Sequence, residues 1–385
     1  MTERFDAVVI GGGPVGAAAA LEMSAADLSV LLIEAREGLA ASGDLRPLAL
    51  SYGSRLILER LGVWQALEAA TPIERIHVSQ RGRFGRTVLT AAEAGLPALG
   101  YVLDYAAVLC ALDEAVEGAR LSTSLRVLRG ARVTTIAHDR NSARVTFESA
   151  AGPADCRASV VAVADGRAEA LDVPVRVVDY GQSAVSARID TDRGHARMAY
   201  ERFTSEGPLA LLPYGSGYAV VWTTTAERAE GLRDAAPQEF VDRLQDRFGE
   251  RAGRFTAVSA RAVHRLALRI AEHPTCGRAA LVGNSAQALH PVAGQGFNLG
   301  LRDAWELAAE IRKRGADDEG LLQAYGARRR VDRRGGIAFT HALVKIFSND
   351  WLPLALARGA GLTVLDCVPP AKKFVARRMI FGARG

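Results

Sequence analysis

A glycine-rich turn close to the start of the chain restricts the possible folds more than any other feature. Residues 7–10 form a continuous apolar run, which predicts a strand buried on both faces, and the turn at residues 11–16 (GGGPVG) follows at once. Residues 17–26 then have helical character, residues 29–33 predict a second strand, and Glu34 ends that strand. This succession predicts a βαβ unit that binds a dinucleotide, and therefore an α/β chain built on a parallel sheet.

Each residue type in this unit has a physical task. Gly11 allows the tight turn, Gly13 lets the backbone approach a pyrophosphate, and Gly16 lets the helix pack closely on the strand. Glu34 can accept hydrogen bonds from ribose hydroxyls and disfavours a 2′-phosphate, so FAD or NAD fits better than NADP. The alternative is a glycine-rich turn without a ligand. The candidate cofactor-binding residues of this unit are Gly11, Gly13, Pro14, Val15, Gly16, Glu34 and Ala35.

A second glycine loop lies in the C-terminal half. Residues 279–282 predict a buried strand, and residues 290–298 (HPVAGQGFN) lead into a helical stretch at 299–312. Such a loop presents backbone N–H groups that can stabilise negative charge on the pyrimidine end of a reduced flavin, which favours FAD. The candidate cofactor-binding residues here are Gly283, Asn284, Pro291, Gly294, Gln295, Gly296, Phe297 and Asn298.

These segments resemble a known class of enzymes. Gly283-Asn284 and the loop that follows are similar to the second FAD-binding fingerprint of the para-hydroxybenzoate hydroxylase class of flavoprotein monooxygenases, and Asp165-Gly166 after an apolar strand matches the third. Within that class the chain resembles, over essentially its whole length, the ubiquinone-biosynthesis hydroxylases, above all those that act on 2-polyprenyl-6-methoxyphenol. The segments that carry this resemblance are residues 44–51 (DLRPLALS), 201–203 (ERF), 207–213 (GPLALLP) and 289–300 (LHPVAGQGFNLG).

The resemblance implies a discontinuous Rossmann-like FAD-binding domain with an inserted substrate domain of mixed or antiparallel sheet and a C-terminal helical region. Alternating apolar and polar residues at about 180–225 agree with an antiparallel sheet, and residues 237–248 look helical. The expected boundaries are 1–75, 101–176 and 270–330 for the FAD-binding domain, 76–100 and 177–269 for the substrate domain, and 331–385 for the helical region.

The resemblance also implies the chemistry. NAD(P)H is expected to dock transiently and reduce FAD, and O2 then gives a flavin C4a-hydroperoxide that hydroxylates a polyprenylated phenol of ubiquinone biosynthesis. The chain has no second Gly-x-Gly-x-x-Gly and no Cys-x-x-Cys, which argues against a disulfide reductase or an enzyme with two dinucleotide domains. Arg46 matches an arginine of the family's flavin domain.

Two positions depart from the wider class. Asn284 stands where most members have Asp, although an amide can still hydrogen-bond a ribityl hydroxyl or a phosphate oxygen. Asp165-Gly166 is followed by Arg167-Ala168 in place of Ser-Arg, which weakens any transfer of detailed contacts near Asp165.

No general base for the phenol stands out. His290, just before the flavin loop, is the candidate catalytic residue, and the alternative is a histidine that hydrogen-bonds its own loop. Tyr180 and Tyr214 could line the substrate pocket, with core packing as the other interpretation.

The C-terminal stretch at residues 371–381 interleaves basic and apolar residues at helical spacing. One interpretation is an interfacial helix that meets an anionic membrane and helps to admit a polyprenyl tail. The other is a helix packed on the body or at a subunit contact, as in a homo-oligomer. We expect a cytoplasmic protein, peripheral to the inner face of the cytoplasmic membrane in the first case, whose partners include other ubiquinone-biosynthesis proteins.

Composition narrows the remaining classes. The net charge is +5, but the arginines are scattered among acidic residues, so no nucleic-acid partner is expected. The four cysteines lie far apart without metal-ligand spacing, which predicts buried reduced thiols and no metal site. The N-terminus does not look like a signal peptide, and no run of about 20 apolar residues predicts a membrane span.

Three alternatives stay open at this point. A hydroxylase of a small soluble aromatic compound would need a polar anchor for its substrate. A flavin-dependent halogenase or a prenyl reductase would share the fold, although the halogenase motif W-x-W-x-I-P is absent. The third alternative is a non-catalytic FAD-binding component of a biosynthetic assembly.

Overall fold

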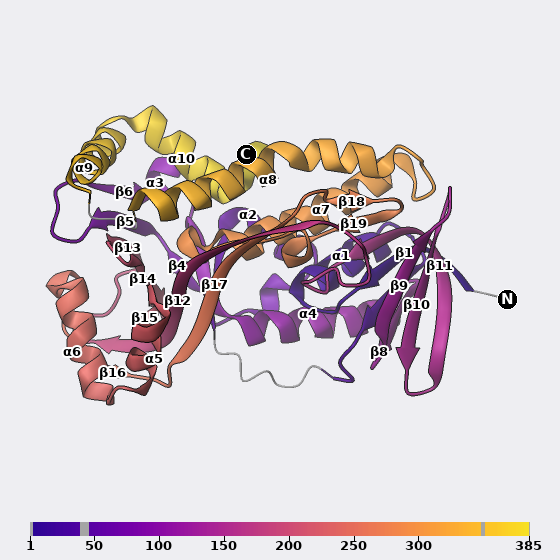
Figure 1. Ribbon diagram of the computed structural model, residues 1–385, viewed down its shortest axis with the longest axis horizontal. Helices are drawn as coiled ribbons and strands as arrows, with labels where there is room; N and C mark the ends of the chain where they lie inside the picture. The colour runs from indigo at the N-terminus through magenta and orange to yellow at the C-terminus, as the bar shows by residue number, and fades with distance from the viewer. Residues whose placement is uncertain (1–2, 39–45, 348–350, 385) are drawn as a thin grey trace.

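The computed structural model describes residues 3–38, 46–347 and 351–384. Figure 1 shows a parallel sheet at one end, a second sheet at the other end, and C-terminal helices that lie along one side of both. Asp44 and Leu45, which belong to the family-like segment at 44–51, lie outside the described residues.

The predicted βαβ unit is present and is the centre of a parallel sheet. Strand β1 (Glu3–Ile10) pairs with β2 (Val30–Glu34) on one side and with β11 (Gly152–Val163) on the other. The sheet continues to β8 (Leu125–Arg129) beyond β2 and to β19 (Ala279–Leu281) beyond β11, all in parallel. The strands that follow β1 in the chain thus lie on both sides of it, first β2 and β8 on one side and then β11 and β19 on the other. In sheets of this kind, ligands bind at the carboxyl ends of the strands next to such a switch in strand order.

Helices and a small antiparallel layer cover the two faces of this sheet. Helices α1 (Pro14–Ser24), α4 (Tyr105–Arg120) and α7 (Gln295–Arg314) pack on one face and share a hydrophobic core with it. The antiparallel strands β9 (Arg132–His138) and β10 (Ala143–Ser149) extend from β11 and cover the other face. Helix α1 is rich in alanine, which lets it lie close to both the sheet and α7.

The second sheet is mixed and confirms the antiparallel strands expected at about 180–225. Its pairs are antiparallel except for β13 with β5, which is parallel. The order is β20 (Gln287–Ala288), β17 (Ala262–Ala271), β12 (Val175–Thr191), β15 (Gly217–Thr225), β14 (Gly207–Tyr214), β13 (Met198–Thr204), β5 (Arg75–Gln80) and β6 (Arg86–Thr90), with β16 (Phe255–Val258) beside β12.

One face of the second sheet carries its own core. Helices α5 (Ala226–Asp234) and α6 (Pro237–Phe248) cover it, and the latter matches the helix expected at 237–248. Trp222 of β15 meets Phe240 of α6 there, with ring centroids 5.8 Å apart. The opposite face looks towards the parallel sheet and the C-terminal helices. The predicted domain boundaries are not tested by these pairings and stay predictions.

A third, three-stranded antiparallel sheet consists of β3 (Pro47–Ser51), β7 (Gly100–Asp104) and β4 (Thr71–Ile73), and β18 (Thr275–Cys276) adds an antiparallel edge strand to the first sheet beside β19. The remaining elements are α2 (Tyr52–Arg60), α3 (Ala91–Ala94) and the 3-10 turns Trp64–Ala66, Glu250–Ala252, Gly283–Ser285, Val292–Gly294 and Gly382–Arg384.

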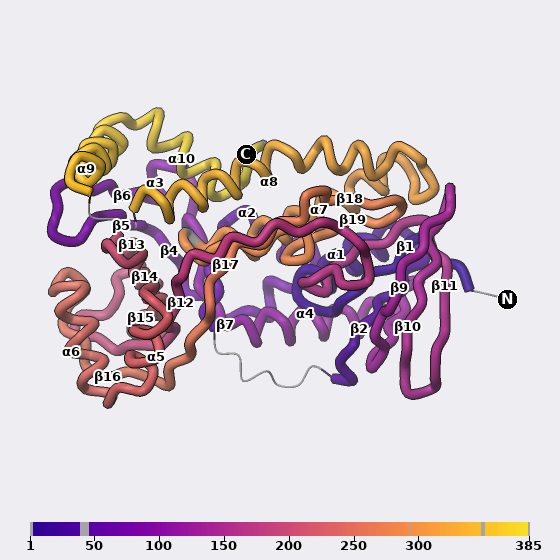
Figure 2. Tube along the Cα trace, viewed as in Figure 1, coloured from indigo at the N-terminus to yellow at the C-terminus, as the bar shows by residue number. Residues whose placement is uncertain are grey.

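The C-terminal region is helical, as expected. Helix α8 (Leu321–Phe347) runs along both sheets, α9 (Leu352–Cys367) lies over β5 and β6, and α10 (Pro369–Phe381) packs on α2 and α3 (Figures 1 and 2). Among the described residues, no individual helix is long and apolar enough to span a membrane. The pair α9 and α10, with a 98° bend between them, reaches the required length and composition only when the two helices are taken together.

The cysteines differ in part from the expectation. Cys156 is buried in the sheet and Cys276 is half-buried, but Cys110 and Cys367 are exposed. The prediction of four buried thiols is therefore wrong for two of them, because Cys110 lies on the outer side of α4 and Cys367 ends α9.

Candidate active site

A cavity of about 950 Å³ begins at the carboxyl ends of the parallel strands and continues between the second sheet and the C-terminal helices. This volume is at the upper end of the usual range for ligand pockets. Apart from Gly16, every candidate cofactor residue lines it, namely Gly11, Gly13, Pro14, Val15, Glu34, Ala35, Arg46, Asp165, Gly166, Gly283, Asn284, Pro291, Gly294, Gln295, Gly296, Phe297 and Asn298.

The glycines of the N-terminal turn explain why the cavity comes so close to the backbone. Gly11 has a φ of +98°, and a Cβ on it would lie 2.8 Å from the backbone of Ala164. A Cβ on Gly16 would lie 1.9 Å from the Gly11 carbonyl oxygen, so Gly16 serves helix packing and lies behind the cavity wall. A Cβ on Gly13 would meet nothing within 4 Å, which leaves room for a ligand against the backbone.

Two helices point their N-termini at this cavity. Gly13 precedes α1 and Gly294, with φ of +59°, precedes α7, and neither helix has a side-chain cap within the described part of the chain. The first N–H groups of a helix have no partner inside the helix, and they carry partial positive charge. The two uncapped ends therefore offer two separate sites for phosphate or carbonyl oxygens on one ligand.

Glu34 is held at the end of β2 as a carboxylate. Burial alone would raise its pKa, but hydrogen bonds from the Arg36 side chain and backbone and from the Gly12 N–H lower the pKa below its usual value. The Arg36 Nε lies 2.7 Å from Glu34 Oε1. An ionised acceptor therefore stands beside the glycine turn, where the sequence places the ribose contact.

The candidate third fingerprint meets the second one in space. Asp165 accepts hydrogen bonds from the Ser285 hydroxyl at 2.9 Å and from the backbone N–H of Ala168 at 2.7 Å. The Gly166 N–H donates to the same Ser285 hydroxyl at 2.8 Å. Segments about 120 residues apart in sequence are thus joined at the cavity wall.

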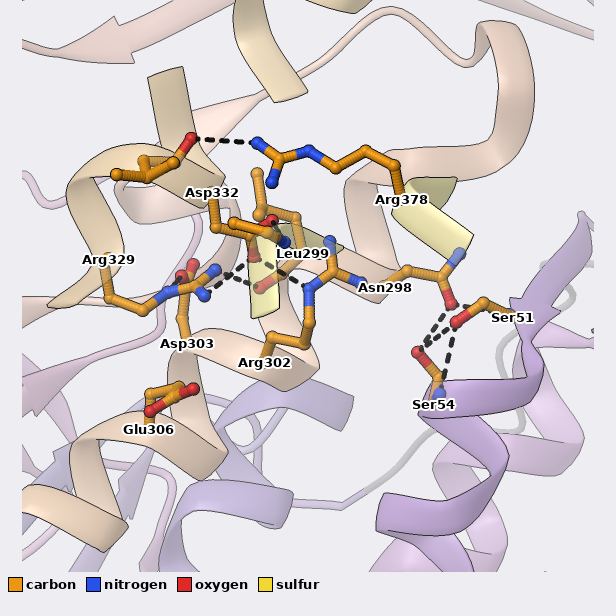
Figure 3. Close-up of polar contacts among 12 residues, drawn as sticks. Ser51, Ser54, Asn298, Leu299, Arg302, Asp303, Glu306, Arg329, Asp332 and Arg378 are labelled. Carbon is orange, nitrogen blue, oxygen red and sulfur yellow. Dashed lines mark hydrogen bonds and ion pairs between the residues drawn. The ribbon is translucent and has the colours of Figure 1, made fainter. Parts of the chain in front are cut away.

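Asn298 lines the cavity, but its side chain binds the protein. Its Oδ1 accepts from the Ser51 N–H and the Ser54 hydroxyl, at 2.8 and 2.6 Å (Figure 3). Its Nδ2 donates to the Ala49 and Gly294 carbonyls, at 3.0 and 2.6 Å. These four bonds use the full capacity of an amide. Asn298 therefore fixes β3 and the start of α7 to one another, and its contribution to ligand binding is positional.

A buried charge network anchors the segment at 283–298 from behind (Figure 3). Asp303 of α7 accepts from the Gly283 N–H at 3.1 Å, from Gln287 at 2.7 Å and from Arg329 of α8 at 2.7 Å. Arg329 also donates to Asp332 at 2.8 Å, and its pKa is raised by the two carboxylates although burial alone would lower it. All of these charges are largely buried, so each needs its partner.

Arg46 lies at the entrance of the cavity. Its guanidinium lies over the ring of Tyr105, 5.2 Å from the centroid, and the residue is exposed. Arg46 thus lines the cavity together with Tyr105, and its contact with the cofactor stays a prediction.

His290 does not fit the role of catalytic base. It is buried and is not among the residues that line the cavity in the described chain. Its Nδ1 accepts a hydrogen bond from the Val292 N–H at 3.1 Å, its ring packs edge-on against Tyr180, and burial lowers its pKa to about 4. The geometry supports the alternative interpretation, a neutral histidine that shapes its own loop.

The two tyrosines are also engaged elsewhere. The Tyr180 hydroxyl lies 2.9 Å from His341 Nδ1, and the Tyr214 hydroxyl donates to Asp104 at 2.7 Å. Neither residue lines the cavity.

The part of the cavity next to the second sheet is strongly apolar. Its walls come from β5, β6, β13–β15 and the three C-terminal helices. The lining residues include Ile76, Val78, Leu89, Phe203, Ala210, Leu212, Val221, Leu343, Phe347, Leu362, Leu365, Val375, Met379 and Ile380.

Glu201 of β13 is the charged residue on this largely apolar wall, and its sequence pattern alone indicates no role. It lines the cavity, burial raises its pKa to about 7, and its Oε1 has no hydrogen-bond partner in the described residues. The residue lies within a family-like segment (ERF), but sequence alternation alone does not show which face of β13 meets a cavity.

The charge network yields a prediction about Asp303. Asp303→Asn keeps the side-chain volume but leaves Arg329 with one buried carboxylate in place of two, so we expect a loss of about 2–4 kcal/mol in the free energy of unfolding. Chemical denaturation of the variant and of Asp242→Asn, an exposed control on α6, measures this. A loss below about 1 kcal/mol for Asp303→Asn would contradict the anchoring role.

Known proteins are similar to this chain in sequence and in fold. The FAD binding domain family matches residues 4–335. Ubiquinone hydroxylase UbiL from Rhodospirillum rubrum is 33% identical over 386 residues, which cover 97% of this chain and 88% of that protein. The 3-demethoxyubiquinol 3-hydroxylase of Escherichia coli is 29% identical over 93% of this chain and 94% of that protein.

Among solved structures, p-nitrophenol 4-monooxygenase PnpA from Pseudomonas putida DLL-E4 has the same fold, with a TM-score of 0.79 over the full length of both chains at 20% identity. The chain therefore belongs to the FAD-binding flavoprotein family that contains the ubiquinone hydroxylases, and it is an FAD-dependent monooxygenase.

Proposed function

We propose that this protein hydroxylates a polyprenylated phenol in ubiquinone biosynthesis, with FAD as its cofactor, NAD(P)H as a transient electron donor and O2 as the oxidant. The observation that carries the proposal is the continuity of the cavity. Its dinucleotide half, at the ends of β1, β2 and β11, opens directly into an apolar half beneath α8–α10. The similarity to ubiquinone hydroxylase UbiL and to 3-demethoxyubiquinol 3-hydroxylase supports the same reaction.

The residues of the dinucleotide half suit FAD. The turn at 11–16 and the N-terminus of α1 would hold the pyrophosphate, and Glu34 would accept hydrogen bonds from the ribose. The uncapped start of α7, at Gly296 and Phe297, would face the pyrimidine end of the flavin. When bound, FAD supplies the redox chemistry and the activation of O2, and the protein supplies orientation and a dry site.

The apolar half favours a lipid-like substrate over a small aromatic acid. Its described lining carries no lysine or arginine that could pair with a substrate carboxylate, whereas Arg36, Arg46 and Arg132 all belong to the dinucleotide half. Leucine, valine and phenylalanine side chains instead offer the surface that a prenyl chain needs. They also keep water away from the reacting ring, which protects the hydroxylation from wasteful loss of peroxide.

The substrate preference is directly testable. We expect purified protein with FAD and NAD(P)H to hydroxylate phenols with a prenyl tail, and kcat/KM to rise by about tenfold or more with each added isoprene unit until the cavity is filled, because each buried CH2 contributes about 0.8 kcal/mol. Product analysis by mass spectrometry across a series of tail lengths, with 4-hydroxybenzoate as the control substrate, measures this.

Preference for the tail-less acid would support the alternative of a small soluble aromatic substrate. Failure of NAD(P)H to bleach the flavin in the presence of any of these phenols would support a non-catalytic component.

We further propose that α9 and α10 contact an anionic membrane surface. Their inner sides line the cavity through Leu362 and Met379, while Phe374 is 70% exposed between the exposed cations Lys373 and Arg377. Lys372, which precedes Lys373, forms an ion pair with Glu93 of α3 at 2.9 Å and so holds α10 against α3. An apolar side chain flanked by basic ones is suited to the headgroup region of a bilayer, next to the place where a prenyl tail would enter.

Vesicle binding tests the membrane contact. We expect the protein to co-sediment with vesicles that contain phosphatidylglycerol, less at high salt, and Phe374→Asp to weaken this binding about tenfold. The matched control is Leu121→Asp, because Leu121 is 91% exposed but follows α4, far from α10 (Figure 1). Equal losses in the two variants, or no binding by the unchanged protein, would refute the proposed contact.

A further inference from the structure

The apolar wall of the cavity contains one carboxylate whose position the fold determines closely. Residues alternate along β13, so that Ala199, Glu201 and Phe203 share the face towards the cavity. Tyr200, between them, also borders the cavity, but its ring packs into the core on the α6 side of the sheet, against Phe248. Glu201 therefore stands on the substrate side of the strand.

The strands on both sides of β13 surround Glu201 with apolar residues. Its register partners are Val78 on β5 and Ala210 on β14, and Ala210 in turn pairs with Val221 on β15. All of these residues line the cavity. The same row continues to Thr87 on β6, which also lines the cavity, and to Ser186 on β12, so that Glu201 is the charged side chain of the row.

The same face leads to the loop before α7. Phe203, two positions after Glu201, packs in one cluster with Val292 of that loop and with Val344 of α8. Glu201 thus lies two residues along β13 from a side chain that packs on the loop before α7, where we propose that the flavin binds.

Charged groups of the neighbouring elements do not neutralise Glu201. On its own strand, Arg202 donates to the Phe248 carbonyl on the α6 side of the sheet. On β5, His77 stacks with Tyr200 and Arg75 bonds the Ala196 carbonyl. On α8, His341 contacts Tyr180 and Lys345 is exposed. On α9, Arg358 donates to the side chain of Gln80. Burial is accordingly the cause of the raised pKa of Glu201, at about 7.

Glu201 as a whole is half-buried, but its Oε1 is buried without a hydrogen-bond partner among the described residues. A carboxylate oxygen in this state destabilises a fold unless a ligand satisfies it. A phenol is a suitable ligand, because its O–H donates to a carboxylate and its ring becomes more reactive towards an electrophilic oxygen as the proton leaves. An apolar residue of similar size would pack here without that cost. The position of Glu201 therefore indicates a role with the substrate.

We propose that Glu201 is the general base that activates the phenol, an inference that rests on the proposed hydroxylase function. The phenol O–H bond breaks, its proton moves to a carboxylate oxygen of Glu201, and the electron pair left on the phenol oxygen enriches the ring carbon that accepts the oxygen atom. That carbon then gives up its hydrogen as a proton to water, the ring regains aromaticity, and the proton on Glu201 returns to the phenolate oxygen. NAD(P)H, through FAD, would supply the two electrons that reduce the second oxygen atom of O2 to water.

The test compares Glu201→Gln, Glu201→Asp and the exposed control Glu239→Gln in the FAD-loaded enzyme. We expect Glu201→Gln to bind FAD and to be reduced by NAD(P)H as before, but to lose hydroxylation by about 100-fold or more and to release hydrogen peroxide instead. Glu201→Asp should recover part of the activity, and Glu239→Gln should match the unchanged protein. The pH profile of hydroxylation should show a limb near pH 7 that Glu201→Gln lacks.

A prenylated phenol with electron-withdrawing groups, already ionised at the assay pH, separates a base from a structural residue. Glu201→Gln should process this substrate nearly as well as the unchanged protein does. Undiminished hydroxylation of the ordinary phenol by Glu201→Gln, or equal losses with both phenols, would overturn the proposal. If Glu201→Gln fails to fold, the pH profile of hydroxylation by the unchanged protein tests the proposal instead. A profile without a limb near pH 7 would then count against Glu201 as the base. No hydroxylation by the unchanged protein would instead refute the proposed function itself.

Discussion

The carboxylate of Asp303 holds together the parts on which the site depends. It accepts hydrogen bonds from the Gly283 N–H, just after β19, from Gln287 of β20 and from Arg329 of α8, and all three contacts are buried. One ion thereby joins the parallel sheet, the second sheet and the C-terminal helix. Because a buried charge tolerates little displacement from its partner, the network places the start of α7 relative to β1, and so relates the two uncapped helix ends that face the cavity.

This arrangement explains why one cavity has two different halves. The dinucleotide half is built from backbone groups at the ends of strands and helices, together with the ionised Glu34, and it suits the phosphates and riboses of FAD. The other half lies between one face of the second sheet and helices α8–α10, where side chains are apolar. A reactive oxygen species needs such a dry enclosure, and a prenyl chain needs such a surface. Glu201 is the charged group among the described residues that line this enclosure.

Local patterns in the sequence were sufficient for much of the fold. The apolar run at residues 7–10, the glycine turn and the acid at Glu34 predicted the βαβ unit correctly, because each depends on neighbours in the chain. Roles that depend on distant partners could not be predicted in this way. Asn298 has its amide bound by β3, about 250 residues earlier, and His290 turns its ring into the protein although it adjoins the flavin loop. Glu201 stands out only when β5 is known to lie beside β13.

A crystal structure of the protein with FAD and a non-reacting prenylated phenol would test this arrangement most directly. We expect the pyrophosphate at the turn 11–16, the flavin ring beside the start of α7, the phenol oxygen within hydrogen-bond distance of Glu201, and the tail between the second sheet and α9–α10. A phenol ring bound outside the cavity, or a flavin ring turned away from the face of β13 that carries Glu201, would contradict the central claim that one cavity joins cofactor and lipid substrate.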